Sequence, residues 1–236
     1  MTAITSPRDN SQRASQSRLL FQLTIALSAV GLVADVLFMD LPADYPLENP
    51  SGFGQTLLLA QSGLAFLQIP VRVLTIVFFL QWFRRAYFNL RLLGQRPDHS
   101  DSWAVICWFI PILSLFRPYS IMKEIWYGTG ATTGAGTDSR TVLRWWWLAY
   151  IVHYGLGQMA GKAQMKAETM AQLQSASSLS IISSLADMAS AALSILVIGH
   201  VHRAEQRLQL RSQIAGLGGP APEPESLLPT EEESYG

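Results

Sequence analysis

Residues 57–83 read LLLAQSGLAFLQIPVRVLTIVFFLQWF and contain a single charged side chain, Arg72. As a helix rising about 1.5 Å per residue, this stretch is long enough to cross a hydrocarbon core of about 30 Å. Soluble domains carry roughly 25% charged residues, whereas this chain of 236 residues has 14% charged and 49% hydrophobic residues. The sequence therefore predicts an all-α integral membrane protein.

Three further apolar stretches predict three more membrane-spanning helices, at residues 19–39, 145–161 and 179–201. The first is longer than the core of a signal peptide, roughly 7 to 15 residues, and no small-residue cleavage triplet follows it, so we expect a retained anchor. The tryptophan run at residues 145–147 is typical of an interfacial aromatic belt. Together with residues 57–83, these stretches predict four transmembrane helices.

The predicted transmembrane domain covers residues 18–211 and is flanked by two polar tails. Residues 1–17 lack an apolar period, and residues 212–236 are rich in Pro and Glu, so we expect both tails to be disordered. The net charge of the whole chain is zero, but five acidic residues lie in the last fourteen. The rest of the chain therefore carries 17 basic and 12 acidic residues.

Residues 103–116 are apolar but short for a span, and Pro111 interrupts them, which is typical of a re-entrant or interfacial segment. Lys and Arg accumulate on the cytoplasmic side of a membrane. Four crossings place fourteen of the 17 basic residues on that side, whereas a fifth would move residues 117–144 outside. We predict four crossings, with both termini cytoplasmic and residues 103–116 dipping into the inner leaflet.

A short amphipathic helix is predicted after this segment, at residues 119–126. One of its faces is apolar and consists of Ile121, Met122, Ile125 and Trp126. Such a face predicts a helix that lies flat on the inner membrane surface.

Each predicted span carries a stripe of polar or small residues at helical spacing, which predicts a bundle whose inner faces meet. The ionisable members of the stripes lie deep, at about 1.5 Å per residue from the cytoplasmic ends: Asp35 at about 24 Å, Asp187 at about 21 Å, Arg72 at about 16 Å and His153 at about 12 Å. Charges at such depth cost at least about 2.5 kcal/mol each on insertion scales and are expected to pair or to line water.

We therefore predict a cluster of Asp35, Arg72 and Asp187, with His153 one turn or more below. Two carboxylates and one guanidinium leave a negative charge, so the hypothesis is that one Asp binds a proton or a cation at neutral pH. The alternative is a static ion-pair network that fixes the register of the helices.

The predicted cytoplasmic face offers a second candidate site, because basic residues there attract anionic lipid headgroups by about 1 kcal/mol per charge. The candidate lipid or partner surface consists of Arg84, Arg85, Arg91, Arg117, Lys123 and Trp126. The alternative is that these basic residues only set the topology.

No motif supports an enzyme, because HExxH, GxSxG and Walker patterns are absent from the sequence. His200 and His202 point about 200° apart on a helix and do not chelate one metal ion from one face. A single cysteine, Cys107, excludes an intramolecular disulfide framework. We expect no enzymatic activity, no cofactor, no bound metal and no nucleic-acid partner.

A pattern of tryptophan, proline and arginine runs through the centre of the chain. In order it comprises Gln81-Trp82-Phe83-Arg84-Arg85-Ala86-Tyr87-Phe88-Asn89-Leu90 with Leu93-Gly94, Trp103-Ala104-Val105, Trp108-Phe109-Ile110-Pro111-Ile112, Leu115, Arg117-Pro118-Tyr119 and Met122-Lys123-Glu124-Ile125-Trp126. This pattern resembles the bacterial multi-pass membrane proteins grouped as domain of unknown function 4328, over about residues 57–207. The resemblance implies a bacterial plasma-membrane location and brings no substrate, reaction or catalytic residue.

The predicted function is a non-enzymatic membrane protein that scaffolds, or binds an unknown protein partner or anionic lipids, through its basic cytoplasmic face. The residue 103–116 segment and the adjoining surface helix would form the recognition surface. The alternative is a small transporter, or a bundle that conducts ions or protons through the cluster of Asp35, Arg72, His153 and Asp187. For a complete path, that bundle would have to form a homo-oligomer.

Overall fold

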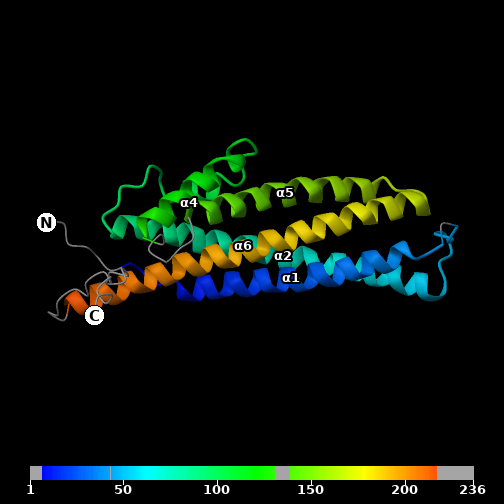
Figure 1. Ribbon diagram of the computed structural model, residues 1–236, viewed down its shortest axis with the longest axis horizontal. Helices are drawn as coiled ribbons and strands as arrows, with labels where there is room; N and C mark the ends of the chain where they lie inside the picture. The colour runs from blue at the N-terminus through cyan, green and yellow to red at the C-terminus, as the bar shows by residue number, and fades with distance from the viewer. Residues whose placement is uncertain (1–6, 43, 131–138, 217–236) are drawn as a thin grey trace, which may run out of the picture.

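The computed structural model describes residues 7–42, 44–130 and 139–216, and all regular structure in this part of the chain is helical. Four long helices run side by side (Figure 1), and a group of short helices lies near the end where α1 begins and α6 ends. The long helices are α1 (Ser11–Met39), α2 (Gly52–Leu92), α5 (Ser139–Met165) and α6 (Met170–Gly216). The short ones are α3 (Trp103–Ile106), the 3-10 helix η1 (Leu113–Leu115) and α4 (Arg117–Gly128).

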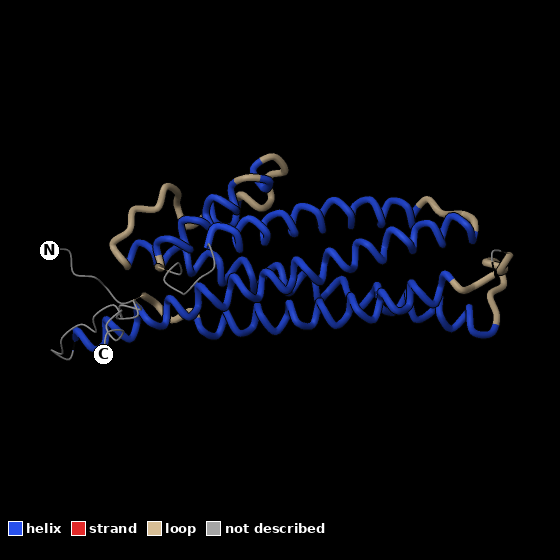
Figure 2. The backbone as a smooth tube through the Cα atoms, viewed as in Figure 1, coloured by secondary structure: helices blue, strands red, loops and turns tan. Residues whose placement is uncertain are grey.

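The long helices form an arc rather than a closed ring. α6 packs along both α5 and α1, and α1 packs along α2. In the part of the chain that the structure describes, α2 and α5 are not in extended contact; α3 and α4 lie against α2, and α4 also contacts α5. Loops are confined to the two ends and to the region around the short helices (Figure 2). The arrangement leaves a seam between α2 and α5.

Three helices, α1, α2 and α6, are long and apolar enough to cross a membrane. This confirms long apolar helices over the spans predicted at residues 19–39, 57–83 and 179–201. The fourth predicted span, residues 145–161, lies in α5, which has 27 residues but does not reach the same apolarity within the described residues. The expectation of four apolar spans is therefore corrected to three, because strongly polar residues are spread along α5, namely Arg140, Arg144, His153, Gln158 and Lys162.

Part of the predicted N-terminal tail is helical, because α1 begins at Ser11. Asn10 is buried, and its side-chain amide donates to the backbone oxygen of Trp82 (3.3 Å). The backbone N–H of Ser11 donates to Asp9 at 2.9 Å and holds the pKa of that carboxyl below its usual range. Asn10 thus attaches the beginning of the chain to α2. Residues 1–6 and 217–236 of the predicted tails lie outside the described residues.

Residues 103–116 fold into α3 and η1 with turns between them, and neither helix is long enough to cross a membrane. Trp108 anchors the segment, with its ring edge-on to Phe79 of α2 at 5.5 Å and to Tyr150 of α5 at 5.5 Å between centroids. Burial raises the pKa of the neighbouring Cys107 thiol to about 11, so it stays protonated and unreactive near neutral pH.

α4 forms as predicted, but its apolar face is not on the membrane surface. The side chains of that face, Ile121, Met122, Ile125 and Trp126, are at most 2% exposed and belong to the main hydrophobic core. The core also contains Leu90, Leu143 and Val201 from the long helices. The apolar face of α4 is therefore covered by protein, which corrects the prediction of a surface helix lying flat on the membrane.

Candidate functional site

Side chains from all four long helices meet around Asp187 of α6. Ser28 of α1 donates a hydrogen bond to Asp187 Oδ2 (2.7 Å), and Arg72 of α2 donates one to the same oxygen (2.9 Å). His153 of α5 places Nδ1 at 3.4 Å from Asp187 Oδ1. The Asp187 side chain is 7% exposed, so the guanidinium and the hydroxyl replace the water that its carboxylate has lost.

The structure brings three of the four predicted cluster residues together and separates the fourth. Asp35 accepts a hydrogen bond from Gln61 (3.1 Å) instead of meeting Arg72. Among the described residues, no cationic group lies within 4.0 Å of the buried Asp35 carboxylate. Asp187 faces Ser28, which precedes Asp35 by seven residues, or about 10 Å along a helix. The predicted cluster is thus corrected to Arg72, His153 and Asp187, with Asp35 about two turns away.

Two cavities adjoin this cluster. The first, which we call the Asp35 cavity, has a volume of about 560 Å³ and is lined by Asp35, three glutamines and four serines of α6 among others. The second, the Trp108 cavity, measures about 330 Å³ and is lined by Asp187, Trp108 and residues of all four long helices. Arg72 and His153 line both cavities, so the cluster lies where the two adjoin.

This arrangement combines a fixed cation, a carboxylate and an imidazole within one small volume. Imidazole and carboxylate are the side chains that most often carry protons between sites in proteins. The serine and glutamine side chains of the Asp35 cavity offer donors and acceptors to water. Among the described residues, no group of three or more His, Cys, Asp or Glu side chains could hold a metal ion.

The predicted lipid or partner surface does not form one continuous patch. Trp126 is 2% exposed and lies in the core, so it is not part of any surface. Arg91 lies 3.5 Å from Asp101, Arg117 Nη1 lies 2.8 Å from His99 Nε2, and Lys123 lies over the Tyr119 ring. Arg84 and Arg85 remain, and they line a pocket on the flank of α2.

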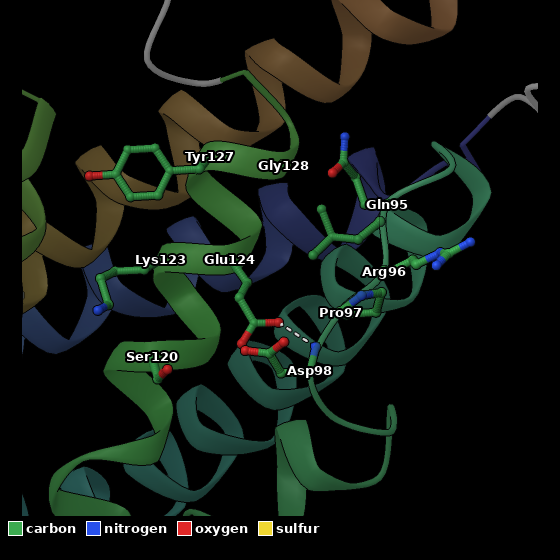
Figure 3. Close-up of a pocket in the computed structure, with 10 residues that line it drawn as sticks. Gln95, Arg96, Pro97, Asp98, Ser120, Lys123, Glu124, Tyr127 and Gly128 are labelled. Carbon is green, nitrogen blue, oxygen red and sulfur yellow. Dashed lines mark hydrogen bonds between the residues drawn. The ribbon is translucent and has the colours of Figure 1, made fainter.

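A surface pocket of about 460 Å³ lies between α4 and the loop that follows α2 (Figure 3). Lys123 and Arg96 line it, but so does Glu124, whose carboxylate points toward the loop and accepts a hydrogen bond from the Asp98 backbone N–H (3.1 Å). The same oxygen accepts a second bond from Tyr87 (2.8 Å). Glu124, which sequence reasoning missed, thus ties this loop to α4 and interrupts the basic surface with a negative charge.

A second acid that sequence reasoning missed is Glu205, which is buried and lies four residues beyond the predicted span 179–201. It is 2% exposed and accepts hydrogen bonds from the side-chain amides of Asn89 (2.8 Å) and Asn10 (3.4 Å). Asn89 also holds the backbone of Arg8 through two hydrogen bonds. Glu205 therefore fastens the beginning of the chain to α2 and α6.

Replacing Glu205 by leucine is expected to release the beginning of the chain. Both amides would lose a buried acceptor, and each unsatisfied buried group costs about 1–3 kcal/mol. Glu205→Gln keeps an acceptor oxygen and is expected to leave the segment in place. Limited trypsin digestion at Arg8 and Arg13 measures the release, with the exposed Glu168→Leu as control. Equal protection of the Glu205→Leu variant and the parent would contradict this role.

Comparison with protein-family models matches residues 54–203 to the family described as Domain of unknown function (DUF4328). Comparisons with curated proteins and with solved structures gave no match. The matched residues run from α2 into α6 and include Arg72, His153 and Asp187, whereas Asp35, Arg8 and Arg13 lie outside them. Because the match covers well over half of the chain, and confirms the resemblance seen in the sequence, the protein belongs to the DUF4328 family.

Proposed function

We propose that this protein is a four-crossing membrane protein that conducts protons between the Asp35 cavity and the Trp108 cavity. The observation that carries the proposal is that Arg72 and His153 line both cavities and that both lie against Asp187. A proton that passes from one cavity to the other would meet this cluster on its way. Asp187 and His153 would accept and pass on the proton, and Arg72 would supply the fixed charge.

The ion pair gives the cluster a way to couple proton binding to movement. A carboxylate that takes up a proton is neutral and no longer holds a guanidinium by charge. Protonation of Asp187 would therefore free Arg72, whose side chain is already 41% exposed to the cavities and the seam. Loss of the proton would restore the pair, so each transfer would return the site to its starting state.

The proposal includes α5 as the fourth crossing. α5 has 27 residues and packs along α6, which is one of the three apolar helices. Four crossings agree with the position of the beginning of α1 and the end of α6 at one end of the bundle (Figure 1). The excess of arginine near that end favours a cytoplasmic location for it, in the plasma membrane of a bacterium. A second copy that covered the seam between α2 and α5 would enclose both cavities.

A scaffold that acts through the cytoplasmic face, the function favoured by the sequence, has lost part of its proposed surface. Its recognition surface included α4 with Trp126, and Trp126 lies in the core. In such a scaffold, the buried polar cluster would serve only to hold the helices in register. The interior is therefore the better-supported site of function.

The test is proton flux into vesicles reconstituted with the purified protein and loaded with a pH-sensitive dye. Under an imposed membrane potential, the parent is expected to acidify the lumen faster than empty vesicles do. Asp187→Asn keeps hydrogen-bonding atoms for Ser28 and Arg72 but cannot carry a proton as a carboxylate, so we expect its flux to fall to the level of empty vesicles. Glu168→Gln, an exposed change, is the matched control.

Thermal unfolding of each variant in detergent separates a loss of flux from a loss of fold. His153→Gln provides a second variant that is neutral and similar in size, and it is expected to slow the flux. The proposal is wrong if the folded parent shows no flux above that of empty vesicles. It is also wrong if folded Asp187→Asn conducts as fast as the parent.

A further inference from the structure

Four arginines line a single pocket of about 370 Å³ at one end of the bundle. Arg8 comes from the segment before α1, Arg13 from the first turns of α1, and Arg84 and Arg85 from α2. The pocket shares no lining residue with the Asp35 cavity or the Trp108 cavity. It is therefore a separate feature from the proposed proton path.

The four arginines of the pocket lack a direct ion pair among the described residues, and Glu205 attracts Arg85 from a longer distance. Within the described part of the chain, no acidic side chain lies within 4.0 Å of any of the four guanidinium groups. Asp101 lines the pocket, but its carboxylate lies 3.5 Å from Arg91, outside the set of four. Like charges gathered in one hollow repel one another unless an anion binds between them.

The arginine nearest the N-terminus is held in place before any ligand binds. The Arg8 backbone N–H donates to the side-chain oxygen of Asn89 (3.1 Å), and the Asn89 amide donates back to the Arg8 carbonyl (3.0 Å). The Arg8 guanidinium lies over the Phe88 ring, 4.9 Å from its centroid. A fixed side chain loses less conformational entropy on binding, which increases affinity for a matching ligand.

The position of the pocket indicates the source of the anion. Arg84 and Arg85 follow directly on the apolar span 57–83, at the level where a span meets the lipid headgroups. Guanidinium groups bind phosphate oxygens through paired, charge-assisted hydrogen bonds. The pocket volume also lies within the range of about 300–1,000 Å³ that is common for sites of small ligands.

We propose that Arg8, Arg13, Arg84 and Arg85 form a binding site for the phosphate of an anionic lipid headgroup from the adjacent leaflet. Arg84 and Arg85 supply charge from the end of the span, and Arg8 and Arg13 close the site from the N-terminal side. The lipid would join the beginning of the chain to α2. The same network of Asn89 and Glu205 that orders Arg8 would thereby order the site.

The experiment is native mass spectrometry of the full-length protein in detergent, titrated with phosphatidylglycerol or with phosphatidylcholine. The parent is expected to bind phosphatidylglycerol in preference. Affinity for it should fall by roughly fivefold for each arginine neutralised, and so by more than tenfold in Arg8→Gln/Arg84→Gln. The control is Arg207→Gln/Arg211→Gln, which removes the same charge from exposed positions on α6 outside the pocket.

Two further arms make the result decisive. Arg8→Lys/Arg84→Lys keeps the charge and loses the paired geometry, so its affinity is expected to lie between those of the parent and the glutamine variant. Equal losses in the pocket variant and the α6 control would overturn the proposal, because general surface charge would then explain binding. Inorganic phosphate that displaces phosphatidylglycerol at an equal concentration would overturn the lipid as the ligand. If the double variant does not fold, the single variants Arg8→Gln and Arg84→Gln are compared.

Discussion

Arg72→Leu is expected to destabilise the folded protein by about 2–4 kcal/mol, somewhat less than the roughly 3–5 kcal/mol typical of breaking a fully buried pair. Among the described residues, the substitution leaves Ser28 as the hydrogen-bond donor to the Asp187 carboxylate, whose side chain is 7% exposed. The Arg72 side chain is 41% exposed, which is why the expected loss is smaller than for a fully buried pair. Unfolding in mixed micelles, followed by circular dichroism, measures the change.

The double variant Arg72→Leu/Asp187→Leu decides between a structural and a functional cluster. Replacing both partners of a buried ion pair by apolar residues is often neutral or stabilising, so most of the lost stability is expected to return. If the cluster only fixes helix register, the double variant is expected to unfold with nearly the same free energy as the parent, and no flux is lost with it. If it conducts protons, the double variant folds and has no flux. Equal destabilisation of the single and double variants would contradict the pairing of Arg72 with Asp187. The control is Arg207→Leu, at an exposed position, whose free energy of unfolding is expected to stay within about 0.5 kcal/mol of that of the parent.

The helical stripes of the sequence were enough to predict most of this cluster. Residues at helical spacing share a face, so Arg72, His153 and Asp187 could all be assigned to the inside of a bundle. The relative heights of the helices could not be obtained in this way, because they depend on how the helices pack. Depth counted from assumed membrane boundaries placed Asp35 level with Asp187, whereas Asp187 meets Ser28.

Polar contacts between segments that are far apart in the chain could not be predicted from local sequence patterns. Asn10, Asn89 and Glu205 lie 79 and 116 residues apart, and of the three only Asn89 belongs to the pattern quoted from the sequence. The sequence assigned Arg8 and Arg13 to a polar tail. Their position in the same pocket as Arg84 and Arg85 depends on how this segment packs against α2, which the sequence pattern does not show. Long-range contacts of this kind make part of the predicted tail a wall of the pocket that Arg84 and Arg85 also line.

The amphipathic pattern of residues 119–126 illustrates a different limit. An apolar helical face must be covered, but its periodicity is the same whether lipid or protein covers it. The sequence correctly predicted the helix and its apolar face. The structure shows that the covering surface is the core formed with α2, α5 and α6.

Trp126→Ala distinguishes these two coverings by its effect on stability. In the core, the truncation removes a side chain that is 2% exposed and packs on the His200 ring at 5.5 Å between centroids. Large-to-small changes of a buried Trp cost about 3–5 kcal/mol, from lost burial and from the cavity left behind. We expect a loss of this size in the free energy of unfolding, measured in detergent.

If α4 lay on the membrane surface, Trp126→Ala would have little effect on stability. There the indole would contact lipid or detergent in the folded protein, and its removal would weaken membrane contact while leaving the unfolding free energy nearly unchanged. Tyr127→Ala is the matched control, because Tyr127 is the next residue of α4 and is 47% exposed. Similar small effects for both variants would return α4 to the membrane surface and Trp126 to the recognition surface first predicted. A large effect confined to Trp126 would fix α4 as a structural brace between α2 and α6, because its apolar face would then be needed to hold the arc of helices together.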